Sequence, residues 1–238
     1  MKKFFLVVLP ILFIQIACNK TVIDDEEIIS THVLTQEEQD KLTPDEIIED
    51  LKSGNKDFIE DNLTIRNSTQ RVREAALGQY PEAVVLSCLD SRVPVEDVFH
   101  KAIGEIFVAR VAGNIVNDDI LGSLEYACKV SGSKAIVVLG HEHCGAIKSS
   151  IQGVKLGYVT SILEKIEPAV ILAKQNFKGE ATYKNPLFMD EVCKFNVINS
   201  VNLIKQKSEI LNEMEEQNQI KIVGAIYDMT TGKVNFLP

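Results

Sequence analysis

Three residues of this chain have the types and the spacing of a zinc site. His141 and Cys144 lie three apart within the sequence Gly-His-Glu-His-Cys-Gly, and Cys88 belongs to a second motif earlier in the chain. Zinc selects thiolate and imidazole ligands, and three protein ligands leave a fourth tetrahedral position open for water. The set therefore predicts a catalytic metal site. If Cys144 begins a helix, the amides of the first turn favour its thiolate form.

Two other interpretations of these residues stay open. Cys88 and Cys144 could form a redox or disulfide pair, although such a pair has no use for the histidine, aspartate and arginine nearby. His143 could compete as a zinc ligand. Its place beside Cys144 would require a strained chelate, so we interpret His143 as a residue at the rim of the pocket or facing solvent.

Asp90 and Arg92 add two charged groups to the predicted site. They lie two apart, directly after Cys88, so a bidentate ion pair between them is geometrically easy. Arg92 could hold the Asp90 carboxylate where it accepts a hydrogen bond from metal-bound water and assists the loss of its proton. The alternative is a salt bridge at the start of a helix with no catalytic role.

Continuous apolar runs indicate the elements that position these residues. The runs cover residues 83–86, 106–109, 135–139 and 220–226. Unbroken β-branched runs are typical of strands covered on both faces, as in a parallel sheet, and the segments between them, such as 118–130, can supply crossover helices. We expect an α/β fold with a central, mostly parallel sheet flanked by helices. Both metal-binding motifs directly follow such runs, at the strand ends where open sheets bind ligands.

Further helices and a hairpin complete the expected domain. Thr43 and Glu46 form a capping box around Pro44, which predicts a helix of two or three turns to Lys52. Residues 154–177 and 189–217 are expected to be longer helices, and residues 228–232 a hairpin turn between two final strands. Cys128 and Cys193 lie in helical patterns with apolar neighbours, as small core residues do.

The first residues have the pattern of an export signal. Lys2 and Lys3 precede an apolar run over 4–16, which is too short to span a bilayer comfortably, and Ala17 and Cys18 follow. A cysteine in this place resembles the lipobox of bacterial lipoproteins, although Gln15 stands where leucine is usual. We expect an export signal over 1–17 and lipidation of Cys18, with a plain cleaved signal or an uncleaved anchor as alternatives.

This start of the chain predicts an envelope protein. Lipidated at Cys18, it would be anchored to a bacterial membrane on the periplasmic or surface side. The polar and acidic segment 18–42 is expected to be a tether, and the folded domain to cover 43–238.

Composition limits the partners. The chain has 238 residues, of which 45% are hydrophobic and 25% charged, as expected for one globular domain with short additions. Its net charge of -9 offers no basic surface for phosphates, which excludes nucleic acid as the expected partner.

In order and spacing, the motifs resemble those of the β-class carbonic anhydrases. The resemblance covers about residues 44–237, and one departure from it is Val111, where the family usually has asparagine. The motifs that carry it are Gln79-Tyr-Pro, Cys88-x-Asp90-Ser-Arg92, Phe107-Val-Ala-Arg110-x-Ala-Gly113-Asn114, Ser123-Leu-Glu-Tyr126 and Gly140-His141-x-x-Cys144-Gly145.

The resemblance implies an enzyme and its cofactor. It implies one Zn²⁺ per subunit on Cys88, His141 and Cys144, and reversible hydration of carbon dioxide to bicarbonate and a proton, by zinc-bound hydroxide that attacks carbon dioxide in a small apolar pocket. The enzyme would be a carbonate dehydratase, a lyase. In one branch of the family the aspartate at the position of Asp90 displaces the water from zinc, which gives an inactive form.

The resemblance also implies further site residues and an assembly. A glutamine at the position of Gln79 donates its amide to the bound substrate, often across a dimer interface, and the backbone near Gly113 contributes to the substrate pocket. Family members are homodimers or higher homo-oligomers in which an N-terminal helical arm wraps on the partner. Two other functions stay open: a non-catalytic zinc-binding or thiol-binding envelope protein, and a hydrolase of carbonyl sulfide or carbon disulfide on the same fold.

Overall fold

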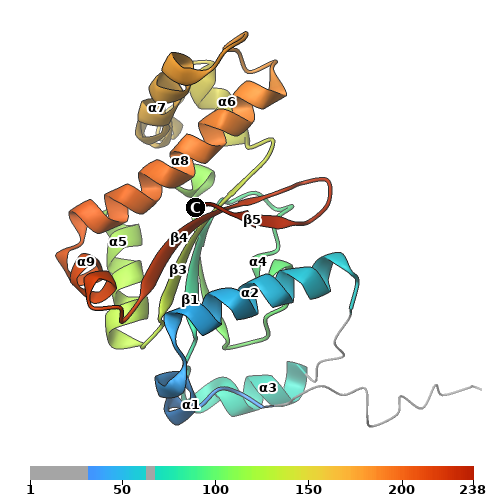
Figure 1. Ribbon diagram of the computed structural model, residues 1–238, viewed down its shortest axis with the longest axis vertical. Coiled ribbons are helices and arrows are strands. Elements are labelled where there is room, and N and C mark those ends of the chain that lie inside the picture. Colours follow the sequence, from blue (N-terminus) through green and yellow to red (C-terminus); the bar gives the residue numbers. More distant parts are fainter. Residues whose placement is uncertain (1–31, 63–67) are drawn as a thin grey trace, which may run out of the picture.

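The computed structural model of the protein describes residues 32–62 and 68–238 (Figure 1). The expected export signal over 1–17 and the expected lipidation site, Cys18, lie outside these residues. Within the described ranges, no helix combines the length and the apolar character needed to cross a membrane.

The described strands form one mostly parallel sheet, as the apolar runs predicted. The strands are β1 (Ala83–Ser87), β2 (Ile106–Arg110), β3 (Ala135–His141), β4 (Lys221–Tyr227) and β5 (Val234–Phe236). Their order is β2-β1-β3-β4-β5; the first four are parallel and β5 is antiparallel to β4. Every residue of β1 and β3 is buried, which explains why these runs are apolar without alternation.

The register of β1 and β3 brings two motifs to one edge. Ser87, the last residue of β1, pairs with Leu139, and β3 continues for two more residues to His141. Cys88 follows Ser87 directly. The backbone of Cys88 and that of His141 therefore lie near each other at the carboxyl edge of the sheet.

Helices cover both faces of the sheet (Figure 1). One face packs against α2 (Pro44–Ile59) and α4 (Val95–Val98). The other packs against α5 (Asp118–Glu125), the π-helical turn η4 (Tyr126–Val130), α8 (Pro186–Lys207) and α9 (Glu209–Glu216). The fold is the α/β sandwich that the sequence predicted.

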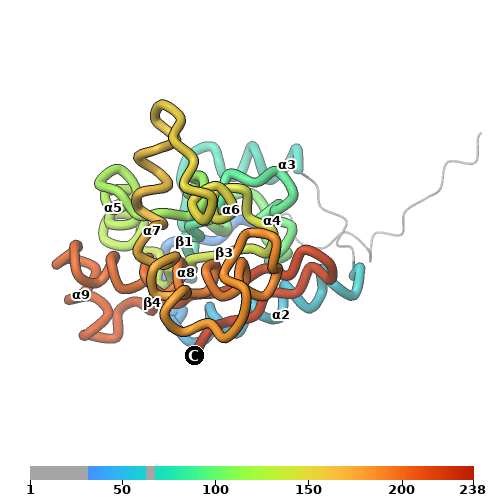
Figure 2. The backbone as a smooth tube through the Cα atoms, turned by 90° about the horizontal axis from the view of Figure 1, so that it is seen from above, coloured from blue at the N-terminus to red at the C-terminus, as the bar shows by residue number. Residues whose placement is uncertain are grey.

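A third group of helices lies at the carboxyl ends of the strands (Figures 1 and 2). It consists of α6 (Gly145–Ile151), α7 (Val159–Asn176) and the first half of α8. Their apolar side chains form a separate core that includes Cys88 and Cys144. The two thiols are thus packed between the sheet and this helical layer.

Helix α2 begins as predicted but is longer than predicted. Thr43 and Glu46 form the capping box, and the helix then runs to Ile59 rather than ending at Lys52. It continues because its buried face continues: Gly54 passes so close to the Phe99 carbonyl that a Cβ would lie 2.0 Å from the oxygen. Asn55 is also buried there and bonds the final hairpin.

Two other helices differ from their predicted limits. The expected helix 154–177 begins only at Val159, and the turn before it is joined to the helix by a hydrogen bond from the Leu156 amide to Thr160 Oγ1 (2.8 Å). The expected helix 189–217 begins at Pro186 and is broken at Ser208, whose hydroxyl accepts the Leu211 amide and caps α9. The hairpin turn over 228–232 is present between β4 and β5.

The folded domain begins before the predicted boundary at residue 43. Within the expected tether 18–42, Gln36–Lys41 form helix α1, capped by Thr35 and Glu38. The buried Gln39 amide donates to the carbonyls of Pro81 (2.8 Å) and Ser131 (2.9 Å). These bonds dock α1 on the domain, so the tether assignment is wrong for this stretch. After α2 the chain forms α3 (Ser68–Glu74) and η2 (Ala75–Leu77).

Candidate metal centre

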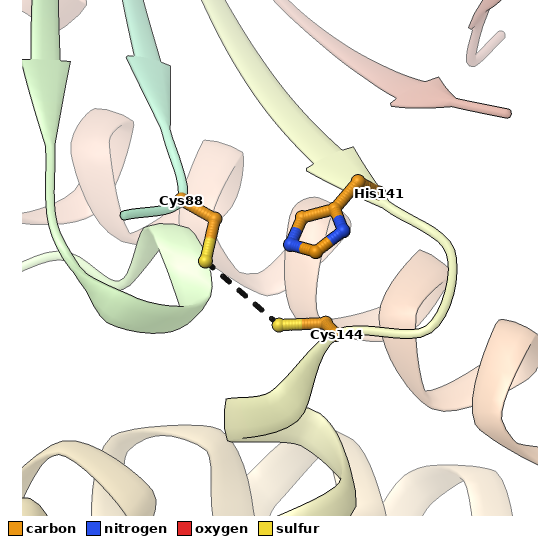
Figure 3. Close-up of side chains that lie close together, drawn as sticks. All are labelled: Cys88, His141 and Cys144. Carbon is orange, nitrogen blue, oxygen red and sulfur yellow. Dashed lines mark hydrogen bonds between the residues drawn. The ribbon is translucent and has the colours of Figure 1, made fainter. Parts of the chain in front are cut away.

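The three predicted zinc ligands meet at the carboxyl edge of the sheet. Cys88 directly follows β1, His141 ends β3, and Cys144 is the residue before α6. All three side chains are buried and point toward one another (Figure 3). Among the described residues they form the one group of histidine, cysteine or acidic side chains placed to hold a metal ion.

The spacing of the ligand atoms fits a tetrahedral zinc ion. The Cys88 and Cys144 sulfurs are 3.9 Å apart, and the three ligand atoms lie within 4.8 Å of one another. With zinc–sulfur bonds of about 2.3 Å, two sulfurs of a tetrahedral site are separated by about 3.8 Å. The two thiols are free, and their separation is far longer than the roughly 2 Å of a disulfide bond.

The imidazole of His141 is oriented for metal binding. Its Nδ1 lies 2.8 Å from the Glu142 carbonyl oxygen, a contact in which Nδ1 carries the proton and donates it. The buried Nε2 has no hydrogen-bond partner among the described residues. A buried lone pair without a partner is costly in a native protein, and a metal ion would satisfy it.

The two thiols of the metal-free protein share a proton. The Cys144 thiol donates to Cys88, and this bond, with those from the backbone amides of Gly113 and Asp90, lowers the pKa of Cys88 to about 4 against the effect of burial. The same bond, followed by burial and the Cys88 charge, raises the pKa of Cys144. One thiolate is therefore already formed, and metal binding would release the remaining proton.

Asp90 and Arg92 form the bidentate ion pair expected from their spacing. Arg92 Nε donates to Asp90 Oδ1 (2.9 Å), and Arg92 Nη2 donates to Asp90 Oδ2 (2.8 Å). The bond to Arg92 holds the pKa of the Asp90 carboxyl below its usual range. Asp90 Oδ2 lies 3.9 Å from His141 Nε2, so a carboxylate that stays ionised borders the metal site. The catalytic role of the pair stays a prediction.

Gly113 lies against a ligand sulfur. Its amide donates to Cys88 Sγ over 3.2 Å. The residue has a φ of 73°, and a Cβ here would lie 2.7 Å from Ile166 Cδ1, so both the backbone conformation and the space require glycine. Its implied contribution to a substrate pocket stays a prediction.

Gln79 is not brought to this site within one subunit. It is exposed and lies four residues before β1, whereas Cys88 follows the other end of that strand. A strand of five residues spans roughly 16 Å. His143 is exposed at the rim, as expected, and its carbonyl accepts a bond from Arg92 Nη2 (3.4 Å).

Arg110 has a role that the sequence interpretation missed. From the end of β2 it donates to two carbonyls of the Cys88 motif, through Nε to Cys88 (3.0 Å) and through Nη2 to Asp90 (2.6 Å). It thereby fixes the backbone that carries a ligand and the carboxylate. An arginine that ends an apolar strand at this edge of the sheet was the available signal.

The chain is similar to known carbonic anhydrases. A model of the carbonic anhydrase family matches residues 83–234. Carbonic anhydrase 2 of Mycobacterium tuberculosis is 31% identical over 189 residues, which cover 77% of this chain and 87% of the relative.

Two solved structures share the fold. Tetrameric β-carbonic anhydrases of Sordaria macrospora match with a TM-score of 0.63 and 22% identity, over 69% of this chain and 84% of that one. A Coccomyxa β-carbonic anhydrase, solved with acetazolamide, matches with a TM-score of 0.64 and 25% identity, over 78% of this chain and 83% of that one. The family match over residues 83–234, together with the fold shared with these β-carbonic anhydrases, shows that the chain belongs to the β class of the carbonic anhydrase family.

Proposed function

We propose that this protein is a carbonate dehydratase, a lyase that catalyses the zinc-dependent, reversible hydration of carbon dioxide to bicarbonate and a proton. The observation that carries the proposal is the Cys-His-Cys group with an unpartnered Nε2 beside an ionised carboxylate. Membership of the carbonic anhydrase family supports it. A bound zinc ion would supply a Lewis acid that lowers the pKa of a water molecule to near neutrality.

The charged pair would orient the nucleophile and keep it reactive. Because Arg92 holds both oxygens of Asp90, the carboxylate can accept a hydrogen bond but does not retain a proton near neutral pH. The Arg92 side chain is 54% exposed and that of Asp90 16% exposed, so the pair lies at the boundary between the buried ligands and solvent. A proton that leaves the site beside Asp90 would therefore have a short route to solvent.

The surroundings of the sulfurs favour a small, neutral substrate. Cys88 and Cys144 are packed in one core with Ile115, Ile147 and Ile166. Carbon dioxide has no charge to lose on entering such surroundings, whereas an ionic substrate would lose its hydration there.

Carbon dioxide hydration by stopped flow, with zinc measured per chain, tests the proposal. We expect rapid hydration with about one zinc per subunit. Zinc at that ratio without hydration at neutral or alkaline pH would contradict the proposal, and carbonyl sulfide and carbon disulfide would then be the next substrates to assay.

Asp90→Asn tests the carboxylate. The variant should keep zinc and lose about 10- to 100-fold in activity. Asp97→Asn, at an exposed carboxylate of α4, is the matched control and should behave as the parent. Full activity in Asp90→Asn would remove the carboxylate from the mechanism.

We propose further that the protein works as a homo-oligomer in which Gln79 serves the site of another subunit. The Sordaria relatives are tetrameric, and Gln79 lies at the far end of β1 from Cys88 of its own subunit. Gln79→Ala should lower turnover and keep zinc. Mixing inactive Cys88→Ala subunits with Gln79→Ala subunits should restore activity, because a Gln79→Ala site would then receive an intact glutamine; no recovery would contradict action across the interface.

We also propose that Cys18 is lipidated and holds the protein at a bacterial cell envelope. The support is the sequence pattern of residues 1–18. Fatty-acid labelling should mark the parent protein, and Cys18→Ser should remove the label and move the protein from the membrane fraction to the soluble one. Equal labelling of both proteins would refute lipidation at this residue.

A further inference from the structure

Helix α8 carries three polar side chains on a face that is otherwise a core face. Cys193, Asn196 and Ser200 are buried, at spacings of three and four residues. Such spacings place side chains on one side of a helix. Val197 and Ile204 on the same helix belong to the apolar core against the sheet. Buried polar groups in this setting are costly unless each makes a hydrogen bond.

All three side chains donate to backbone carbonyls at the metal site. Cys193 Sγ donates to the carbonyl of His141 (3.4 Å). Asn196 Nδ2 donates to the carbonyl of Gly113 (2.9 Å), and Ser200 Oγ donates to the carbonyl of Asn114 (3.2 Å). One face of α8 thus contacts both the strand end that carries a ligand and the turn whose amide meets Cys88.

That turn has an unusual backbone. Gly113 has a φ of 73° and Asn114 a φ of 41°, so two successive residues are left-handed, one of them not glycine. Left-handed residues other than glycine cost free energy and persist where surrounding contacts hold them. The contacts from Asn196 and Ser200 are of this kind. They keep the Gly113 amide at 3.2 Å from Cys88 Sγ.

The Asn196 side chain is specialised for this contact. It is 1% exposed, and its Oδ1 has no hydrogen-bond partner among the described residues. The one hydrogen bond that this side chain makes among the described residues is therefore the bond to the turn at the metal site. Leucine in its place would leave the buried carbonyl of Gly113 without this donor.

We propose that α8 is a positioning element of the metal site, in which Asn196, assisted by Ser200, sets the hydrogen bond from the Gly113 amide to the Cys88 thiolate. This inference rests on the proposed zinc site. An amide that donates to a thiolate draws negative charge from the sulfur, so the sulfur gives less charge to the metal, which remains a stronger Lewis acid. Because two of the three ligands are thiolates, the charge that each sulfur gives to the metal strongly affects how good a Lewis acid the metal is.

Asn196→Leu tests the proposal, because leucine has the same branched arrangement of heavy atoms and donates no hydrogen bond. The first readout is the thiolate-to-metal charge-transfer band of the cobalt(II)-substituted protein, and the second is zinc affinity by chelator competition. We expect the band to move to longer wavelength, because the sulfur becomes richer in electrons. We expect zinc affinity to fall by about 10- to 100-fold, because the sulfur is no longer held in place and binds a competing proton more tightly. Asn202→Leu, at an exposed asparagine of the same helix, should match the parent in both readouts.

Ile204→Val separates positioning from general loss of packing, because Ile204 is fully buried in α8 but bonds nothing at the metal site. An unchanged band and affinity in Asn196→Leu would overturn the proposal, and so would an equal change in Ile204→Val. If Asn196→Leu does not fold, Ser200→Ala provides the same test: a smaller shift in the same direction supports the proposal, and the parent's spectrum and affinity overturn it. The cobalt spectrum is independent of turnover, so a parent that binds zinc but fails to hydrate carbon dioxide would refute the proposed function alone.

Discussion

Replacing Gly140 with alanine tests how closely β3 must approach α8 for His141 to stay in place. A Cβ at residue 140 would lie 2.6 Å from Val197 Cγ2 and 3.0 Å from Cys193 Sγ. Contacts this short force the backbone or the neighbours to move, and overpacking of a core typically costs about 1–3 kcal/mol. We expect the free energy of unfolding to fall by about 2 kcal/mol.

The same change should weaken zinc binding. Gly140 directly precedes His141, so relief of the clash moves the imidazole relative to the two sulfurs. Metal–ligand distances tolerate only about 0.2 Å. Val197→Ala would remove the clashing methyl group. By itself it should lower the free energy of unfolding by roughly 2 kcal/mol, because it leaves a cavity in the core. The double variant should recover about 1 kcal/mol relative to the sum of the two single changes.

Urea unfolding and chelator competition measure these two effects. The matched control is Gly145→Ala, beside another ligand, because a Cβ there meets nothing within 4 Å. That change should leave stability unchanged or raise it by up to about 1 kcal/mol, and zinc should stay bound. If Gly140→Ala behaved like Gly145→Ala, or if the double variant were simply additive, the close approach of β3 to α8 would not control His141.

Three further predictions concern the scaffold and the thiols. Asn55→Ala should lower the free energy of unfolding by about 3 kcal/mol in urea titrations, because it leaves two buried carbonyls and one amide without their hydrogen bonds. A loss below about 1 kcal/mol would contradict this prediction. Gln39→Ala should lower the free energy of unfolding by about 1–3 kcal/mol and increase hydrogen exchange in α1, without changing zinc content. Unchanged exchange would mean that α1 does not depend on this docking contact. In the zinc-free protein, a small alkylating reagent should modify Cys88 at a rate that stays level from about pH 8 to about pH 6 and falls only toward about pH 4. The reason is that the lowered pKa of Cys88 keeps its thiolate present at every pH above that pKa. Mass spectrometry should find Cys128 and Cys193 unmodified, since burial raises the pKa of each to about 12, and a tenfold loss of Cys88 reactivity per pH unit below about pH 8 would refute the assignment.

Much of the fold follows from local patterns in the chain. The four continuous apolar runs became the four parallel strands, because residues covered on both faces of a sheet must be apolar throughout. The capping box at Thr43 fixed the start of α2 for a similarly local reason. Helix ends were predicted less well. Where α2 stops depends on Gly54 and Asn55 meeting segments remote in the sequence, which no local pattern records.

The candidate site divides in the same way. The types and spacing of Cys88, His141 and Cys144 predicted the metal group, because ligand chemistry belongs to the side chains and the strand ends indicated where they meet. The Asp90 and Arg92 pair was predictable because the two residues are near neighbours in the chain.

Tertiary structure alone decided what surrounds the site. Cys193 looked like an ordinary core residue, and Asn196 is separated from Gly113 by 83 positions. An asparagine in a buried helical stripe was a signal that something is bonded there, but the sequence did not say what. Partners of buried polar groups are set by how α8 crosses the sheet, and that crossing results from packing of the whole core rather than from any single segment.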